Sequence, residues 1–166
     1  MKFNLKQFYS FCSQLKIETK EQGLRNMDTL LGTQTYVMDE IAKGLENDIH
    51  FFVILKGRQL GITTISLALD LYWQFTHPGW QGTLVSDTEE NRDMFRSTLA
   101  MYMDGLPKEY KIPLVAHNRN QLVLKTVPVC SIKLLVTNLV LVKVKPLLIC
   151  MVQKLLHGVT RKVLHL

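Results

Sequence analysis

The order of apolar and polar residues predicts strands and helices that alternate along the middle of the chain. Five consecutive apolar residues at Phe51–Leu55 have the length of a buried strand. Apolar residues at helical spacing over 63–75 predict the clearest helix. Short strands are predicted at 82–86 and 121–124, with a further helix over 89–103 between them. This alternation indicates an α/β fold with a mainly parallel sheet.

Two amphipathic helices are predicted before the buried strand. Residues 3–16 and 34–45 both place apolar side chains at helical spacings, although Gly44 interrupts the second segment. The segment 17–33 between them is polar and contains glycines, which predicts a loop or a short hairpin.

The helix predicted over 89–103 has a core face and a solvated face. Its apolar spacing selects three core residues: Met94, Leu99 and Met103. Arg92 and Arg96 are expected on the solvated face, as most charged residues of a surface helix are.

Composition excludes several classes of protein. The chain has three cysteines, widely spaced and without a CxxC pair, which argues against a disulfide framework and against a zinc site. Lys2 and Lys6 interrupt the N-terminal apolar residues, so no signal peptide is predicted. The longest strongly apolar stretch, 134–142, is too short to span a bilayer. We therefore expect a soluble, cytoplasmic protein with no membrane partner.

The net charge of +6 comes from the C-terminal part of the chain alone. Residues 1–126 hold 14 Lys and Arg and all 14 Asp and Glu, so their charges sum to zero. Residues 127–166 hold six Lys and Arg and no acidic residue, and all aromatic residues lie before residue 111. The neutral body therefore offers no basic stripe of the kind that nucleic-acid-binding domains display.

The segment FFVILKGRQLGITTIS (51–66) has the sequence form of a phosphate-binding loop. An apolar strand is followed by a turn with Gly57 and Gly61, and then by a helix that begins on Thr63 and Thr64. Glycines let backbone N–H groups approach anionic oxygens, a hydroxyl at the helix start can ligate Mg²⁺, and a lysine neutralises the terminal phosphates. The usual loop has that lysine after its last glycine, where this chain has Ile62.

Neighbouring residues can supply the missing chemistry. Lys56 lies at the mouth of the loop, from where its flexible stem could reach the phosphates, and Arg58 adds a second cation. The amide of Gln34 could donate to and accept from an adenine edge. In the plainer alternative the glycines serve only a strand-to-helix turn, and Gln34 is an exposed helix residue.

The loop also carries a family resemblance. KGRQLGITT (56–64) resembles the deviant Walker A loop of tailed-phage terminase large subunits, the ATPase motors that package DNA into proheads. That family commonly has R-Q-x-G-x-[ST]-T here, and some members carry the lysine at the front of the loop. The upstream Gln34-Thr35-Tyr36 resembles the family's adenine-recognising glutamine, and VSDTEENRDMF (85–95) also lies where family members have it. The resemblance covers roughly residues 25–126.

The resemblance implies a P-loop NTPase-like three-layer sandwich, here incomplete, with ATP and Mg²⁺ as cofactors. The implied nucleotide-binding residues are Gln34, Lys56, Gly57, Arg58, Gln59, Gly61, Thr63 and Thr64. Thr63 would ligate the metal, and Arg58 would act on the γ-phosphate as an arginine finger does. Hydrolysis also needs an Asp-Glu pair on a later strand, and no acidic residue follows Glu109. The expectation is therefore a fragment that binds ATP and lacks the hydrolytic acid.

The same resemblance implies the partners and the setting. These are phage DNA, the small terminase subunit and the portal protein, in an oligomer encoded by a phage or prophage and located in the cytoplasm of a bacterial host. Two alternatives remain open: another P-loop NTPase of the helicase or translocase kind, and a non-catalytic remnant.

The change of composition near residue 127 suggests three regions. These are an N-terminal helical segment with the adenine-binding region (1–50), a partial P-loop ATPase core (51–126) and a basic, acid-free tail (127–166).

Our hypothesis is that the tail is read in a shifted frame. In the frame one nucleotide earlier, 146–159 permits an apolar strand ending in T-E-V-A-P-W, a pattern similar to terminase-like ATPases. The alternative takes the tail at face value, with Val140, Val142 and Val144 in a strand and Lys143 and Lys145 facing solvent.

Overall fold

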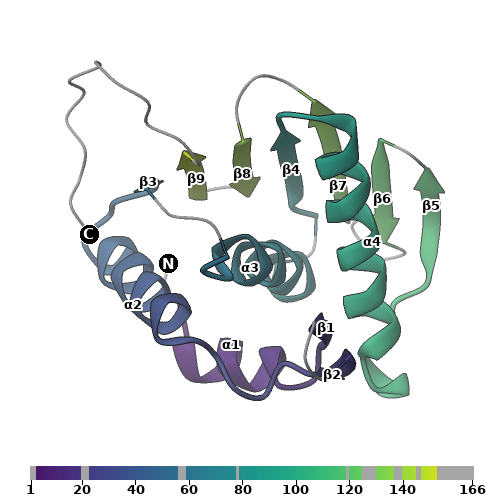
Figure 1. The fold of residues 1–166 in the computed structure, drawn as a ribbon, viewed down its shortest axis with the longest axis horizontal. Helices are drawn as coiled ribbons and strands as arrows, with labels where there is room; N and C mark the ends of the chain where they lie inside the picture. Colours follow the sequence, from purple (N-terminus) through teal and green to yellow (C-terminus); the bar gives the residue numbers. More distant parts are fainter. Residues whose placement is uncertain are drawn as a thin grey trace.

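The computed structural model describes residues 3–19, 23–55, 59–77, 79–118, 120–124, 130–136, 140–144 and 147–152. Within them lie four α-helices: α1 (Leu5–Cys12), α2 (Gly32–Glu46), α3 (Ile62–Thr76) and α4 (Glu89–Gly105), and a 3-10 turn at Lys108–Tyr110. The strands are β1 (Lys16–Thr19), β2 (Gly23–Asn26), β3 (Phe51–Leu55), β4 (Gln81–Ser86), β5 (Leu114–Asn118), β6 (Gln121–Leu124), β7 (Cys130–Val136), β8 (Val140–Val144) and β9 (Leu147–Val152). The fold is mixed α/β, as the alternation of the sequence predicts (Figure 1).

The described strands form two sheets. β1 and β2 pair as an antiparallel hairpin, which confirms the hairpin alternative for the segment between the first two helices. The other strands form one sheet in the order β3-β9-β8-β4-β7-β6-β5. β3 runs parallel to β9 and β4 runs parallel to β7, whereas the remaining neighbours are antiparallel. The prediction of a mainly parallel sheet is therefore wrong: the sheet is mixed, because β5–β6 and β8–β9 enter it as hairpins.

One face of the large sheet is buried beneath the helices. Phe52 and Ile54 of β3 are nearly inaccessible, while their neighbours Phe51 and Leu55 are 50% and 42% exposed. The same alternation runs through β6 and most of β7, as expected for strands with one solvated face. In Figure 1 the described helices gather on the buried side of the sheet.

Helix α3 forms the centre of the core. Eleven of its residues are buried, and it contacts all three other helices as well as β4 and β8. Such a helix is apolar around its whole circumference, which explains the nearly continuous apolar run over 65–73. The aromatic rings of Phe3 and Phe8 from the N-terminal segment pack against Tyr72 and Trp73 and close its outer side.

In helix α4, two side chains lie on the opposite face from the one predicted. Leu99 and Met103 are buried as predicted, but Met94 is 47% exposed. Arg92 is buried instead of solvated, because ion pairs with Glu89 (3.7 Å) and Asp93 (3.2 Å) hold its guanidinium against the core. The core positions that replace Met94 are Phe95 and Tyr102.

The described part of the tail belongs to the same sheet as the rest of the chain. β8 includes Val140, Val142 and Val144, so the strand that the face-value alternative predicts is present; Lys145 lies outside the described residues. β9 pairs with β3 in parallel, and β7 pairs with β4. Ile132 and Leu134 of β7 are buried with the core. Among the helices described, none combines the length and apolarity that crossing a membrane requires.

We predict that Tyr102→Phe lowers the free energy of unfolding by about 1–2 kcal/mol. The Tyr102 hydroxyl is inaccessible to solvent and donates a hydrogen bond to the carbonyl oxygen of Thr64 (3.1 Å), and the substitution removes this bond. Urea denaturation measures the loss. Met94→Ala, an exposed change on the same helix, is the control and should stay within about 0.5 kcal/mol of the wild type. An equal effect of both substitutions would contradict the assignment.

Candidate functional site

The candidate site lies where β3 leads through a short loop into α3. Gly61, the N-cap residue of α3, has a left-handed backbone with φ of 67°. Gln59 is also left-handed, with φ of 62°, and its side chain is exposed. A non-glycine residue in this conformation is strained, and such strain often marks functional loops. Lys56, Gly57 and Arg58 lie outside the described residues.

The first turn of α3 faces the loop with its backbone donors. No described side chain caps this helix, and the first turn contains no acidic residue. The earliest amide with a helical acceptor is that of Ile65, which donates to the carbonyl of Gly61 (3.1 Å). Thr63 and Thr64 lie in the first turn with half-buried side chains. The positive end of the helix dipole and the first N–H groups are thus oriented for an anion.

Helix α2 fixes the loop from the opposite side. The amide nitrogen of Gln34 donates to the carbonyl of Gly61 (2.9 Å), and its amide oxygen accepts from the backbone N–H of Leu31 (2.8 Å). The hydroxyl of Thr33 donates to the carbonyl of Leu60 (3.0 Å). These bonds attach the start of α2 to the last two residues before α3.

The described structure brings Gln34 into contact with Gly61 and places Gln59, Thr63 and Thr64 on the same short loop–helix junction. Gln34 is 5% exposed, so the alternative of a plain exposed helix glutamine is wrong. Its amide retains a second proton and a second lone pair beyond the two bonds that it makes here. Thr33 is a contact residue beyond those predicted, although a hydroxyl residue in the first turn of a helix that also contains Gln34 is a recognisable signal for side-chain bonds to backbone groups.

The acidic groups that the structure describes near α3 are not arranged as a metal site. Among the described residues, no group of three or more His, Cys, Asp or Glu side chains is arranged to hold a metal ion. Asp70 lies two turns into α3 and is completely buried; this burial raises its pKa to about 7. A completely buried carboxyl group that holds its proton up to nearly neutral pH is a poor ligand for Mg²⁺.

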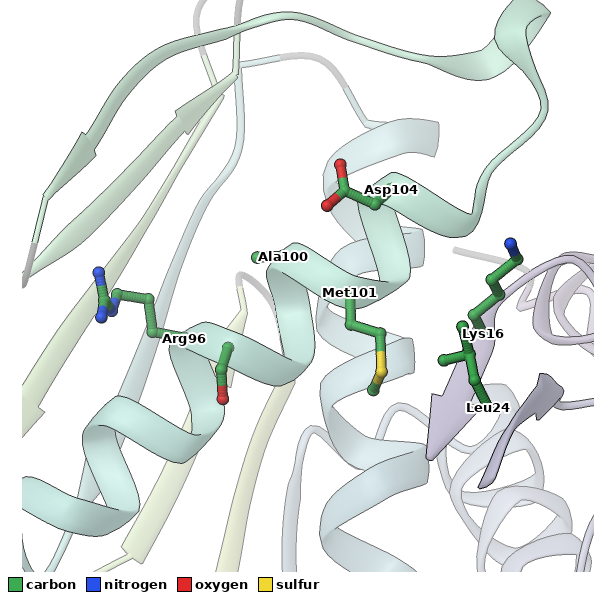
Figure 2. A pocket seen from close by; sticks show the side chains of 7 residues that line it. Lys16, Leu24, Arg96, Ala100, Met101 and Asp104 are labelled. Atoms are coloured by element: carbon green, nitrogen blue, oxygen red, sulfur yellow. The ribbon is translucent and has the colours of Figure 1, made fainter. Parts of the chain in front are cut away.

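A separate groove lies between α4 and the β1–β2 hairpin, and Figure 2 shows its lining. Its volume is about 510 Å³, and its lining residues are Lys16, Leu24, Arg96, Ser97, Ala100, Met101 and Asp104. None of these belongs to the loop over 56–64. Lys16 and Arg96 point away from each other in Figure 2, so the two cations do not converge on one ligand position. The groove therefore lacks the arrangement of an anion site.

No protein-family model, curated protein or solved structure matches this chain.

We predict that Gly61→Ala lowers the free energy of unfolding by about 1–3 kcal/mol, because alanine strains a left-handed backbone. The added methyl group would also lie 2.6 Å from the amide nitrogen of Gln34 and displace the bond between α2 and the loop. Urea denaturation measures the change. Gly32→Ala is the matched control, since its methyl group would meet no atom within 4 Å. A loss as large for Gly32→Ala as for Gly61→Ala would contradict the prediction.

Proposed function

We propose that this chain is the nucleotide-binding part of a P-loop ATPase of the terminase large-subunit kind, which packages phage DNA. The observation that carries the proposal is the junction of β3 and α3. A strand buried on one face leads into a loop whose last residue is a left-handed glycine, followed by a helix that no described side chain caps and that has two threonines in its first turn. ATP phosphates fit this junction, with Mg²⁺ on the hydroxyl of Thr63 and with Lys56 and Arg58 as the cations.

The exposed face of the large sheet supports an incomplete three-layer sandwich. All-parallel sheets are ordinarily covered on both faces, and β3–β9 and β4–β7 are the parallel pairs of this mixed sheet. Here Phe51, Leu55 and Leu135 remain 50%, 42% and 48% exposed on the face away from the described helices. In the parent ATPase, a second layer of helices would cover these side chains.

The position of β9 supports the shifted-frame hypothesis for the tail. β9 is parallel to β3, and Val152 at its end is the register partner of Leu55 at the end of β3. The residue that follows β9 in sequence is Gln153. In the earlier frame, the last base of codon 153 and the first two bases of codon 154 permit a glutamate in the place of Lys154. Since parallel strands end at the same edge of a sheet, this glutamate would follow a strand that ends beside the loop, where the water-orienting acid of a P-loop ATPase is needed.

We predict that ATP with Mg²⁺ stabilises the wild-type chain against heat and that Lys56→Ala weakens ATP binding at least about tenfold. Thermal unfolding at increasing ATP concentration, with and without EDTA, measures both effects. Lys43→Ala removes an exposed cation that pairs with Glu40 on α2 and should leave the affinity unchanged. If ATP with Mg²⁺ fails to stabilise the wild type, the non-catalytic remnant is the correct alternative.

We predict that Lys154→Glu raises Mg²⁺-dependent ATP hydrolysis by about tenfold, because it places a carboxylate where the earlier frame permits the glutamate. Release of inorganic phosphate measures the rate. Gln153→Glu adds a carboxylate one residue earlier and serves as the control, and the double variant Lys56→Ala with Lys154→Glu should be inactive. Equal rates for Lys154→Glu and the wild type would contradict the placement of the missing acid.

Gene context and DNA sequence test the rest of the proposal. A small-terminase gene upstream and a portal gene downstream would exclude the helicase or translocase alternative. Sequencing the source DNA through codons 125–129 tests the frame. An uninterrupted frame, with no acid- and glycine-rich alternative frame downstream, would rule out the shift.

A further inference from the structure

A buried polar cluster joins the second half of α3 to the start of β4. Asp70 and Gln74 are both completely inaccessible to solvent, and both meet the backbone of Gly82. A methyl group on Gly82 would lie 2.5 Å from the Asp70 carboxyl and 2.8 Å from the end of the Gln74 amide. The proposed nucleotide site uses none of these three residues, so the cluster needs its own explanation.

Only one orientation of the Gln74 amide forms hydrogen bonds with the neighbouring backbone groups; we call it the satisfied orientation. With its nitrogen toward Trp80 it donates to the Trp80 carbonyl (2.7 Å), and its oxygen then accepts from the Gly82 N–H (3.0 Å). The reverse orientation places oxygen against oxygen and nitrogen against nitrogen, and both bonds are lost. The satisfied orientation attaches α3 to the segment that leads into β4.

The state of Asp70 decides which orientation is stable. In the satisfied orientation, the Gln74 oxygen lies on the side of Gly82 where the Asp70 carboxyl also lies. A protonated carboxyl can donate to that oxygen, whereas an ionised one repels it and attracts the amide nitrogen instead. Neither carboxyl oxygen of Asp70 makes a hydrogen bond of normal geometry within the described structure.

Because of its surroundings, the Asp70 carboxyl titrates near neutral pH. Burial raises the pKa of Asp70 to about 7, and donation by the Gln74 amide nitrogen, in its reversed orientation, opposes this effect. The charged residues that the structure describes on α1, α2 and α4 do not contribute to the shift, and β4 has none. β8 carries Lys143, whose register partner is Thr83 and not Gly82. His77 follows α3, and desolvation lowers the pKa of its imidazole.

We propose that Asp70 and Gln74 form a proton-operated latch between α3 and β4. When Asp70 is protonated, it donates to the Gln74 oxygen, and Gln74 holds the Trp80 carbonyl and the Gly82 N–H. When Asp70 loses its proton to solvent, Gln74 reverses, and both backbone bonds open. Trp80, whose ring lies 4.4 Å from that of His77, is released with the segment that it belongs to.

The latch stabilises the fold at low pH and weakens as the pH rises. Because the pKa of the buried carboxyl is raised from 3.8 to about 7, the folded chain holds a proton that the unfolded chain releases. This stabilisation is fully present below pH 4 and is lost as the pH rises through 7. With one proton involved, the ionised fraction in the folded chain increases about tenfold between pH 6 and pH 8.

Hydrogen exchange at the Gly82 amide tests the latch. We expect its protection factor, corrected for intrinsic exchange, to fall about tenfold between pH 6 and pH 8 in the full chain. Asp70→Asn supplies a neutral donor at the same position and should keep the protection constant over this range. Its melting temperature should equal or exceed that of the wild type at pH 8 and lose the wild-type decline with pH.

Two controls separate the latch from other effects. His77→Gln removes the neighbouring imidazole and should leave the pH dependence at Gly82 intact. Gln74→Leu removes both bonds and should leave Gly82 unprotected at every pH. A wild-type protection factor that is independent of pH, or a decline of the same size in Asp70→Asn, would overturn the proposal. Loss of the decline in His77→Gln would assign the titration to histidine and overturn it equally.

Discussion

The candidate site depends on the hydrogen bonds that join the start of α2 to the loop before α3. Gln34 and Thr33 hold the carbonyls of Gly61 and Leu60, and these two residues set the direction in which α3 begins. Glycine adopts the left-handed backbone at position 61 without a steric penalty, whereas most other residues would be strained there. The contacts also connect the helix before β3 with the helix after it, although 27 residues separate each bonded pair.

Helix α3 makes buried polar contacts in two places, although most of its side chains belong to the apolar core. At its first turn, Tyr102 donates to the Thr64 carbonyl and anchors α4 beneath the loop. Farther along, Asp70 and Gln74 are buried against the start of β4. A buried polar group without partners is strongly destabilising, so each region ties α3 to a particular neighbour and a particular register.

The sequence predicts the limits of the helices and strands better than the order of the strands in the sheet. The limits of β3 and β6 match the prediction, and those of α3 differ by one residue at each end, because apolar runs and breakers are local signals. The strand order is not local: nothing in the spacing of 140–152 shows that β9 and β8 lie between β3 and β4. The burial of Arg92 is equally hidden, since it depends on how Glu89 and Asp93 pair with it. Within the site, the loop was visible from its glycines, whereas the contact of Gln34 with Gly61 required the tertiary structure.

In the proposed function, nucleotide binding and hydrolysis depend on different parts of the chain. All the proposed binding groups lie between Gln34 and Thr64, and the contacts that shape the described part of the loop come from α2 and α4. The acid that the proposed hydrolysis needs would instead come from far along the chain, and β9 is the strand that brings a distant segment next to β3. A change of sequence after β9 can therefore abolish the chemical step without altering the contacts between α2, the loop and α3. If the frame is shifted from about residue 127, the sequences of β7, β8 and β9 are replaced as well, whereas the contacts among α2, the loop and α3 lie wholly within the unshifted part of the chain.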